Sequence, residues 1–391
     1  MFSKNSIIGV IGSGAMGSGI AQVAASAGHS VIIYDNNEKA LEKAQQQLTK
    51  SLNGLVEKNK ITAEKKEAIL KAILFKHKLP DLATCDLVIE AIVENLEIKK
   101  TVFADLENIL AKQAVIASNT SSLSITALGA AVKNPGHFIG IHFFNPATLM
   151  PLVEIIPGIA TNSEVVDACK SLIDSWGKTT VMAKDTPGFI VNRVARPFYS
   201  EALRIYEEGL ADIATIDWAM KDIGGFRMGP FELMDLIGHD VNYVVTETVW
   251  KQFYFDPKFK PALAQKRLLE GGFLGKKSGS GFYDYRGGAL KPEAVKDEIL
   301  GKMIVNRILC MLINEAADAL YYQIASAEDI DLAMTKGVNY PKGLLKWADE
   351  LGLAHVANTL KSLHDFYEED RYRLSPLIKK HRVSGNGFYH V

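Results

Sequence analysis

The chain has 391 residues and a formal net charge of −1, with 44 Lys and Arg against 45 Asp and Glu. With 48% hydrophobic and 23% charged residues it has the composition of an ordinary folded protein, which excludes disorder as its main state. The balanced charge argues against nucleic acid as a partner, and it leaves any anionic ligand to be attracted by local groups.

The cysteines and the apolar runs exclude two further classes. Cys85, Cys169 and Cys310 lie far apart, without a CxxC or a histidine cluster nearby, so we expect no metal and no disulfide framework. No apolar run approaches the roughly 18 residues of a membrane-spanning helix, and the run at Leu87–Val93 is interrupted by a carboxylate. The first strand-like run begins too early to follow a signal peptide. We therefore expect a cytoplasmic protein without membrane attachment.

The first part of the chain alternates short Val- and Ile-rich runs with longer helix-like stretches, up to about Lys184. This alternation is typical of βαβ units around a parallel sheet. The strand-like runs are Ile7–Ile11, Val31–Tyr34, Leu87–Val93, Val115–Ser118, His137–His142 and Leu152–Ile156. The pattern predicts an α/β domain over residues 1–186.

A glycine-rich loop follows the first of these runs and opens a helix pattern, with the sequence Gly12-Ser13-Gly14-Ala15-Met16-Gly17. Gly12 permits a tight turn, Gly14 lets the backbone approach a pyrophosphate, and Gly17 lets helix and strand pack closely. The next run ends at Asp35, where an acid accepts hydrogen bonds from ribose hydroxyls and repels a 2′-phosphate. The pattern favours NAD over NADP. The simpler alternative for Asp35 is a solvated acid at a strand end.

Two polar stretches also follow strand-like runs. Ser118-Asn119-Thr120-Ser121-Ser122 lies where open α/β sheets bind ligands, although Ser121 or Ser122 could simply cap the next helix. The other stretch begins at His142, and Glu154 lies on the next run. A carboxylate bonded to an imidazole fixes its tautomer and stabilises its protonated form, as a general base for an alcohol proton requires.

After Pro187-Gly188 the apolar residues change to helical spacing, which predicts a domain boundary near residue 185. A second break lies at Arg286–Pro292, where two glycines and a proline suggest a linker. We therefore predict two further domains, both all-α, over residues 187–285 and 295–391.

These two helical domains are predicted to be copies of one another. Asn192-Arg193, Glu201-Ala202, Ile216-Asp217, Ala219-Met220 and Asp235 recur 114 residues later as Asn306-Arg307, Glu315-Ala316, Ile330-Asp331, Ala333-Met334 and Asp349. Near the end the separation falls to 106 residues, where SGSGFY matches SGNGFY. Chance similarity between amphipathic helices would not keep one register over several segments.

Together, GSGAMGSGIAQVAASAGH, SNTSSLSIT, HFFNP and DTPGFIVNR resemble the L-3-hydroxyacyl-CoA dehydrogenase family over the whole chain. The resemblance implies a Rossmann domain followed by a helical domain, with the active site between them. The duplicated helical part is similar to the long members, in which the second copy packs on the first much as a partner subunit does in short dimeric members. The implied activity is the reversible, NAD-dependent oxidation of L-3-hydroxyacyl-CoA to 3-oxoacyl-CoA in fatty-acid or related metabolism.

The resemblance also implies roles for single residues. His142 would take the 3-hydroxyl proton, Glu154 would support it, and Ser121 and Asn192 would bind the substrate. Positions that match NAD contacts are Gly12, Gly14, Ala15, Met16, Gly17, Asp35, Glu94, Lys99, Asn119, Asn145 and Lys277, and positions that match coenzyme A contacts are Ser51 and Lys58.

Several alternatives stay open at this stage. Glu94 and Lys99 could form an exposed charge pattern at a helix start, and Lys58 could belong to a solvated face. Asn306 has no second Rossmann domain to face, so we expect it to be structural. The rival functions are a related dehydrogenase of a small hydroxy or sugar acid, and an NAD-binding protein without catalysis. A short acyl chain is our default, with a longer or carboxylated one as the alternative. The chain could be a monomer with an internal pseudo-dimer or a homodimer.

Overall fold

A computed structural model describes residues 1–389 and divides the chain into two compact units, one ending at Thr186 and one beginning at Pro187. Within the described residues, no helix combines the length and the apolar character needed to cross a bilayer. The last two residues of the predicted third domain, 390 and 391, lie outside the described part of the chain.

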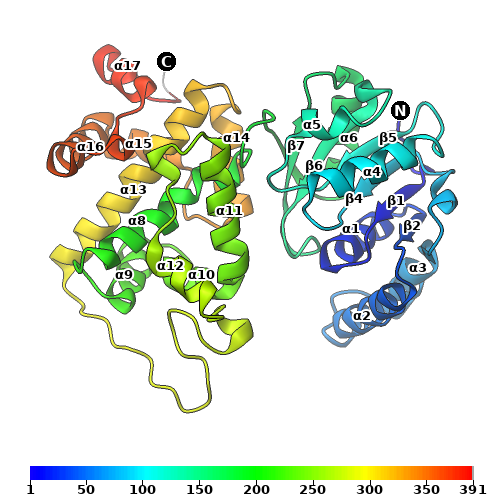
Figure 1. Ribbon diagram of the computed structural model, residues 1–391, viewed down its shortest axis with the longest axis horizontal. Helices are drawn as coiled ribbons and strands as arrows, with labels where there is room; N and C mark the ends of the chain where they lie inside the picture. Colours follow the sequence, from blue (N-terminus) through cyan, green and yellow to red (C-terminus); the bar gives the residue numbers. More distant parts are fainter. Residues whose placement is uncertain (390–391) are drawn as a thin grey trace. The chain divides into compact units, whose positions relative to one another are not determined.

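The first unit is built on an eight-stranded sheet in the order β3-β2-β1-β4-β5-β6-β7-β8 (Figure 1). The strands are β1 (Ile8–Ile11), β2 (Val31–Tyr34), β3 (Ile73–Lys76), β4 (Leu87–Glu90), β5 (Val115–Ser118), β6 (Phe138–Phe143), β7 (Leu152–Pro157) and β8 (Thr179–Met182). All neighbours are parallel except β6 and β7, which pair antiparallel. The order 3-2-1-4-5-6 is that of a Rossmann sheet, so the predicted fold class is confirmed.

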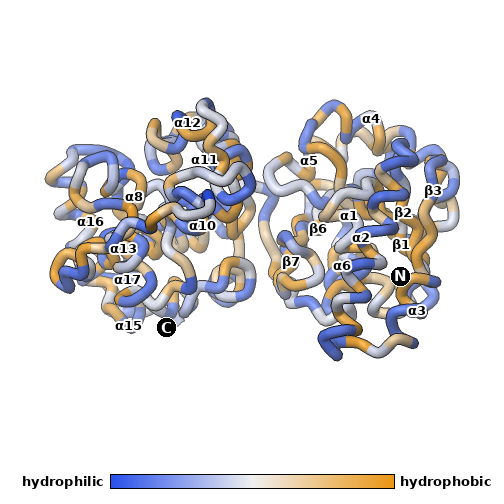
Figure 2. The backbone as a smooth tube through the Cα atoms, turned by 90° about the horizontal axis from the view of Figure 1, so that it is seen from below, coloured by the Kyte–Doolittle hydropathy of each residue, from blue (hydrophilic) through white to orange (hydrophobic). Residues whose placement is uncertain are grey.

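Two strands were not predicted, and both are edges of the sheet. The edge strand β3 directly follows a helix, and only its first residue is buried. The edge strand β8 is two Thr, a Val and a Met with partly exposed ends. Edge strands bury less surface than central strands, so their sequences carry a weaker apolar signal. The central strands β1, β4 and β5 are buried at every position, and β1 lies in the orange, hydrophobic part of Figure 2.

The first unit also has six α-helices: α1 (Ala15–Ser26), α2 (Glu38–Glu57), α3 (Ala63–Ala72), α4 (Leu96–Glu107), α5 (Ile125–Gly129) and α6 (Ser163–Ser175). Four of them begin at a side chain that accepts hydrogen bonds from the first turn, namely Asn37, Thr62, Asn95 and Ser124. The cap of α5 is therefore Ser124. The alternative that Ser121 or Ser122 caps this helix was wrong.

The second unit is helical. Its helices are α7 (Val191–Val194), α8 (Arg196–Glu207), α9 (Ile213–Trp218), α10 (Pro230–Ile237), α11 (His239–Gln252), α12 (Leu263–Glu270), α13 (Glu298–Tyr321), α14 (Ala327–Leu332), α15 (Leu344–Leu351), α16 (Leu353–Tyr367) and α17 (Pro376–Ser384). The long helix α13 is buried along most of its length and packs against α8, α15, α16 and α17. The residues predicted as two helical domains thus form one compact unit.

Both halves of this unit contain the same local construction. Asp217 accepts hydrogen bonds from the backbone N–H groups of Phe231 and Glu232 in the first turn of α10. Asp331, 114 residues later, does the same in the first turn of α15 through residues 345 and 346. Each half also has one turn of π-helix, at Ala219–Ile223 and Ala333–Gly337. The repeat in sequence is therefore a repeat in structure, joined by residues 289–297, which have no regular secondary structure (Figure 1).

Gly140 of β6 packs so closely against Ile125 and Ile156 that a larger residue should destabilise the protein. A Cβ added at Gly140 would lie 2.7 Å from Ile125 Cδ1 and 2.9 Å from Ile156 Cβ, so Gly140→Ala should lower the free energy of unfolding by roughly 1–3 kcal/mol. Gly54 is the control, because its added Cβ meets nothing within 4 Å inside α2. Gly54→Ala should raise stability by up to about 1 kcal/mol. Urea unfolding of both variants measures the two effects, and equal signs would contradict the packing described.

Candidate active site

The glycine loop joins β1 to α1 at the carboxyl end of the sheet. Gly12 has a φ of +99°, a value that side chains rarely allow. A Cβ on Gly17 would lie 1.9 Å from the carbonyl oxygen of Gly12, so only glycine lets the helix approach the turn. Gly14, at the start of α1, has nothing within 4 Å of its Cβ position and is exposed together with Ala15. These residues form an open helix N-terminus of the kind that binds phosphates.

Asp35 closes this loop from the end of β2. Its Oδ2 accepts hydrogen bonds from the backbone N–H of Ser13, at 2.9 Å, and from the Ser13 hydroxyl, at 2.7 Å. Its Oδ1 accepts from the backbone N–H of Asn37 at 3.0 Å. Asp35 is therefore fixed beside the glycine loop and is not merely a solvated strand-end acid. It presents a negative charge where a ribose would lie, which fits NAD and disfavours NADP.

His142 and Glu154 face each other across the antiparallel pair of β6 and β7. His142 Nδ1 lies 2.6 Å from Glu154 Oε2, and the two residues are 5% and 0% exposed. The predicted contact is confirmed. Because a carboxylate can only accept, Nδ1 carries the ring proton and donates a hydrogen bond to Glu154 Oε2. That tautomer makes Nε2 the basic nitrogen, and the carboxylate stabilises the ring when it becomes protonated.

Glu94 organises the polar loop after β5. Its Oε1 accepts hydrogen bonds from the Thr120 hydroxyl at 2.5 Å, from the Ser121 backbone N–H at 3.0 Å and from the Ser122 hydroxyl at 3.1 Å. Burial acts to raise the pKa of Glu94, but the Lys99 ammonium and the bonds from the loop lower it overall. Glu94 therefore stays ionised and holds the loop that carries Ser121.

A buried ion pair, Lys99 with Glu90, lies next to Glu94. Lys99 Nζ lies 2.6 Å from Glu90 Oε1 and 3.1 Å from Glu94 Oε2, and Lys99 is only 1% exposed. The Ser118 hydroxyl donates to Glu90 Oε2 at 2.7 Å. The alternative that Lys99 belongs to an exposed charge pattern was wrong.

Sequence reasoning missed Glu90 as part of the site. The signal was present, because Glu90 is the carboxylate that interrupts the apolar run Leu87–Val93. A carboxylate inside a buried strand needs a partner, and the cation of Lys99 nine residues later supplies it.

One further bond links the polar loop to the strand of the histidine. Asn119 Oδ1 accepts a hydrogen bond from the backbone N–H of Phe143 at 2.8 Å. Phe143 is the last residue of β6 and directly follows His142. The loop and the His142–Glu154 pair are therefore positioned relative to each other.

The roles of the other predicted residues stay predictions. In the first unit, Asn145 is exposed just beyond β6, Ser51 is exposed on α2, and Lys58 caps the end of α2. In the second unit, Asn192 is half-buried on α7, and Lys277 Nζ lies 2.5 Å from Asp240 Oδ1.

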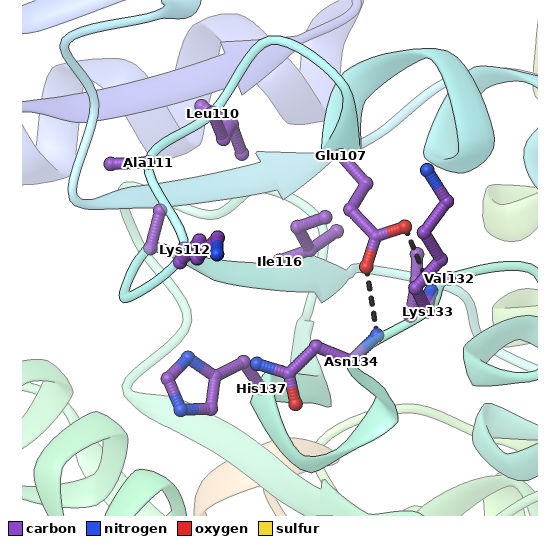
Figure 3. Close-up of a pocket in the computed structure, with 10 residues that line it drawn as sticks. Glu107, Leu110, Ala111, Lys112, Ile116, Val132, Lys133, Asn134 and His137 are labelled. Carbon is purple, nitrogen blue, oxygen red and sulfur yellow. Dashed lines mark hydrogen bonds between the residues drawn. The ribbon is translucent and has the colours of Figure 1, made fainter.

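A cavity of about 310 Å³ lies elsewhere, near the starts of β5 and β6 (Figure 3). It is lined in part by Lys112, Ile116 and His137. At the edge of the cavity, the Glu107 carboxylate accepts hydrogen bonds from the backbone N–H groups of Lys133 and Asn134. It contains none of the predicted site residues. The cavity is therefore separate from the candidate site at the carboxyl ends of the strands.

Two family models match the chain. One is described as "3-hydroxyacyl-CoA dehydrogenase, NAD binding domain" and matches residues 7–186. The other is described as "3-hydroxyacyl-CoA dehydrogenase, C-terminal domain" and matches residues 188–285 and again 303–389. The second model thus matches both halves of the helical unit.

Curated and solved proteins agree with these matches. A 3-hydroxyadipyl-CoA dehydrogenase of Escherichia coli is 40% identical over 97% of this chain and 98% of its own length. A crystal structure of a 3-hydroxybutyryl-CoA dehydrogenase from Escherichia coli is 39% identical, with a TM-score of 0.92 over 97% of this chain and 99% of that chain. A 3-hydroxybutyryl-CoA dehydrogenase of Bradyrhizobium diazoefficiens is 43% identical but covers 72% of this chain, and 95% of its own length.

The glycine loop generates a matched pair of variants. Gly17→Ala should destabilise the first unit by roughly 1–3 kcal/mol or more, because the new Cβ collides with the Gly12 carbonyl. Gly14→Ala should leave the unfolding midpoint unchanged but weaken NADH binding by about tenfold or more, because the methyl group occupies the side on which the pyrophosphate approaches. Thermal unfolding and NADH fluorescence titration separate the two effects. An unaltered NADH affinity in Gly14→Ala would argue against this loop as the phosphate site.

The lowered pKa of Glu94 generates a pH dependence. A carboxylate with a lowered pKa in the folded state contributes stability above its ordinary pKa of 4.5, and this contribution is lost as the pH falls through the folded-state value. Glu94→Gln should therefore lower the melting temperature at pH 7, and the difference from wild type should shrink below pH 4.5. Melting curves between pH 3 and pH 8 test this, with Glu97→Gln, an exposed residue on α4, as the control. A difference that does not vary with pH would contradict the assignment.

Proposed function

The chain belongs to the 3-hydroxyacyl-CoA dehydrogenase family and is an NAD-dependent oxidoreductase of hydroxyacyl-CoA, and from this premise we propose that His142, supported by Glu154, is its acid–base residue. The observation that carries the proposal is the buried bond of 2.6 Å between the two side chains. It gives one imidazole a fixed tautomer and a carboxylate partner beside the ligand-binding edge of the sheet.

The residues of the first unit fit the cofactor. The open helix N-terminus at Gly14 would hold the pyrophosphate, and Asp35 would accept from the ribose hydroxyls. Glu94, Asn119 and Asn145 are the proposed contacts near the other end of the cofactor. When bound, NAD supplies the hydride acceptor for the substrate carbon.

His142 performs the proton transfer in this proposal. Its Nε2 accepts the proton of the 3-hydroxyl group as the carbon is oxidised, and the carboxylate of Glu154 stabilises the imidazolium that forms. In the reverse direction the same nitrogen returns the proton to the 3-oxo group. Ser121, held by Glu94, hydrogen-bonds the reacting oxygen. Asn192 is the proposed contact from the helical unit.

The coenzyme A part of the substrate is assigned to α2 and its end. Ser51 is exposed on this helix, and the ammonium of Lys58 at its C-cap would attract the phosphates that coenzyme A carries. We propose a short acyl chain, with a carboxylated chain as the alternative, in line with the names of the relatives. The expectation of a cytoplasmic protein stays a prediction.

Variants of His142 and Glu154 test the proposed acid–base role. With acetoacetyl-CoA and NADH, His142→Gln should lower kcat by roughly 10²–10⁴-fold, the usual contribution of a general acid or base. Glu154→Gln should also lower kcat strongly, because an amide can stabilise the wrong tautomer. NADH affinity, measured by fluorescence, should stay within about threefold in both variants, since neither residue is proposed to hold the cofactor.

The matched control is Lys112→Met at the separate cavity, which should leave both quantities unchanged. Full turnover in His142→Gln would overturn the assignment. NADH binding without turnover in the wild type would instead support an NAD-binding protein without catalysis. Turnover across acyl-CoA substrates of different length, one of them carboxylated, decides the acyl preference.

A further inference from the structure

A short connection joins the two strands of the proposed acid–base pair. It consists of residues 144–151, between β6 with His142 and β7 with Glu154, and it carries Asn145, a proposed contact of NAD. Of the residues in this connection, only Ala147 is buried. Burial of apolar surface therefore does little to hold the connection in place.

Lys178 supplies an attachment of a different kind. It lies directly before β8 and is half-buried. Its Nζ donates to the carbonyl oxygen of Ala147 at 2.5 Å and to that of Met150 at 2.8 Å. Both acceptors lie in one turn, which is closed by a bond from the backbone N–H of Met150 to the carbonyl of Pro146. Hydrogen bonds from an ammonium group are stronger than those between neutral groups, so two of them can fix this turn.

The ammonium of Lys178 is not shared with a carboxylate. Burial lowers its pKa, and among the described residues no carboxylate forms an ion pair with it that would raise the pKa again. A half-buried cation is unfavourable unless its protons are bonded. The carbonyl oxygens of Ala147 and Met150 therefore serve as its partners, and its main contacts are with the connection.

The connection also contacts the helix of the glycine loop. A Cβ added at Gly19 of α1 would lie 3.1 Å from Ala147 Cβ and 3.7 Å from the backbone nitrogen of Ala147. The connection and the helix thus approach each other closely at a position without a side chain. Asn145, two residues before Ala147, follows a strand that carries the proposed base and precedes a residue that touches both α1 and Lys178.

We propose that Lys178 is a positioning residue for the cofactor: by holding the carbonyl groups of Ala147 and Met150, it sets the place of Asn145 beside α1. This inference rests on the proposed function, in which Asn145 contacts NAD. Lys178 itself contacts neither cofactor nor substrate in this role. It acts on the affinity for the cofactor, whereas the basicity of His142 depends on its own bond to Glu154.

A double-mutant cycle tests whether Lys178 acts through Asn145. Asn145→Ala and Lys178→Met should each raise the Kd for NADH by about threefold to tenfold, the effect of losing one hydrogen bond to a ligand. The double variant should bind NADH within about twofold of the weaker single variant, because the lysine then has no contact left to position. At saturating NADH, kcat of Lys178→Met with acetoacetyl-CoA should stay within about threefold of wild type.

Proteolysis measures how firmly the connection is held, without reference to the cofactor. Leu149 is 74% exposed, and chymotrypsin cleaves after leucine once the chain around it opens locally. Without NADH, Lys178→Met should be cleaved after Leu149 at least about fivefold faster than wild type. Mass spectrometry of the fragments identifies the site of cleavage.

A matched control removes a lysine from the neighbouring helix α6. Lys170 is partly exposed, and its Nζ lies 2.9 Å from Asp174 Oδ2. Lys170→Met should alter neither the affinity for NADH nor the cleavage after Leu149, because a pair of this kind contributes little. If Lys178→Met does not fold, Lys178→Gln, which keeps an N–H donor, replaces it with the same expectations.

Three outcomes would overturn the inference. In the first, Lys178→Met melts at a lower temperature but binds NADH and resists chymotrypsin as wild type does, so that the lysine is only structural. In the second, the two losses of affinity add in the double variant, so that Lys178 does not act through Asn145. In the third, Asn145→Ala binds NADH like wild type, which also removes Asn145 from the proposed function. The first two leave the proposed function intact.

Discussion

A carboxylate that loses all contact with water must find a cation or strong hydrogen-bond donors, and this requirement shapes both units of the protein. Glu154 is fully buried and meets His142. Glu90 is fully buried and meets Lys99. The first pairing depends on β7 running antiparallel to β6 in a sheet that is otherwise parallel, because this register sets the two residues opposite each other. The proposed chemistry thus depends on the same constraint as the fold.

Much of the site could be predicted from the sequence because its signals are local. The glycine loop lies directly between a strand and a helix, and His142 and Glu154 lie on consecutive strands, so their spacing alone suggests contact. The ion pair of Glu90 and Lys99, which contacts Glu94, was harder to predict. Glu90 and Lys99 come from a strand and a helix, and only the packed structure shows that the lysine is turned inward.

The helical unit shows how duplication alters the role of a residue. Asn306 corresponds to Asn192, yet its side chain is held locally: its Nδ2 donates to Thr359 Oγ1 at 3.1 Å, and its Oδ1 lies 2.6 Å from His355 Nε2. In the first half of the helical unit the positions that match His355 and Thr359 are Val241 and Val245, so this pair of contacts is not available to Asn192. The expectation that Asn306 is structural stays a prediction, and these bonds support it.

The segment at residues 289–297, without helix or strand, has a consequence for assembly. Because this segment joins the two halves of the helical unit, their encounter is intramolecular, and its effective concentration does not fall when the protein is dilute. An assembly of separate chains gains its interface only by mass action. The tether removes that dependence, so the interface, with its buried ion pairs, does not have to supply the affinity that free subunits would need.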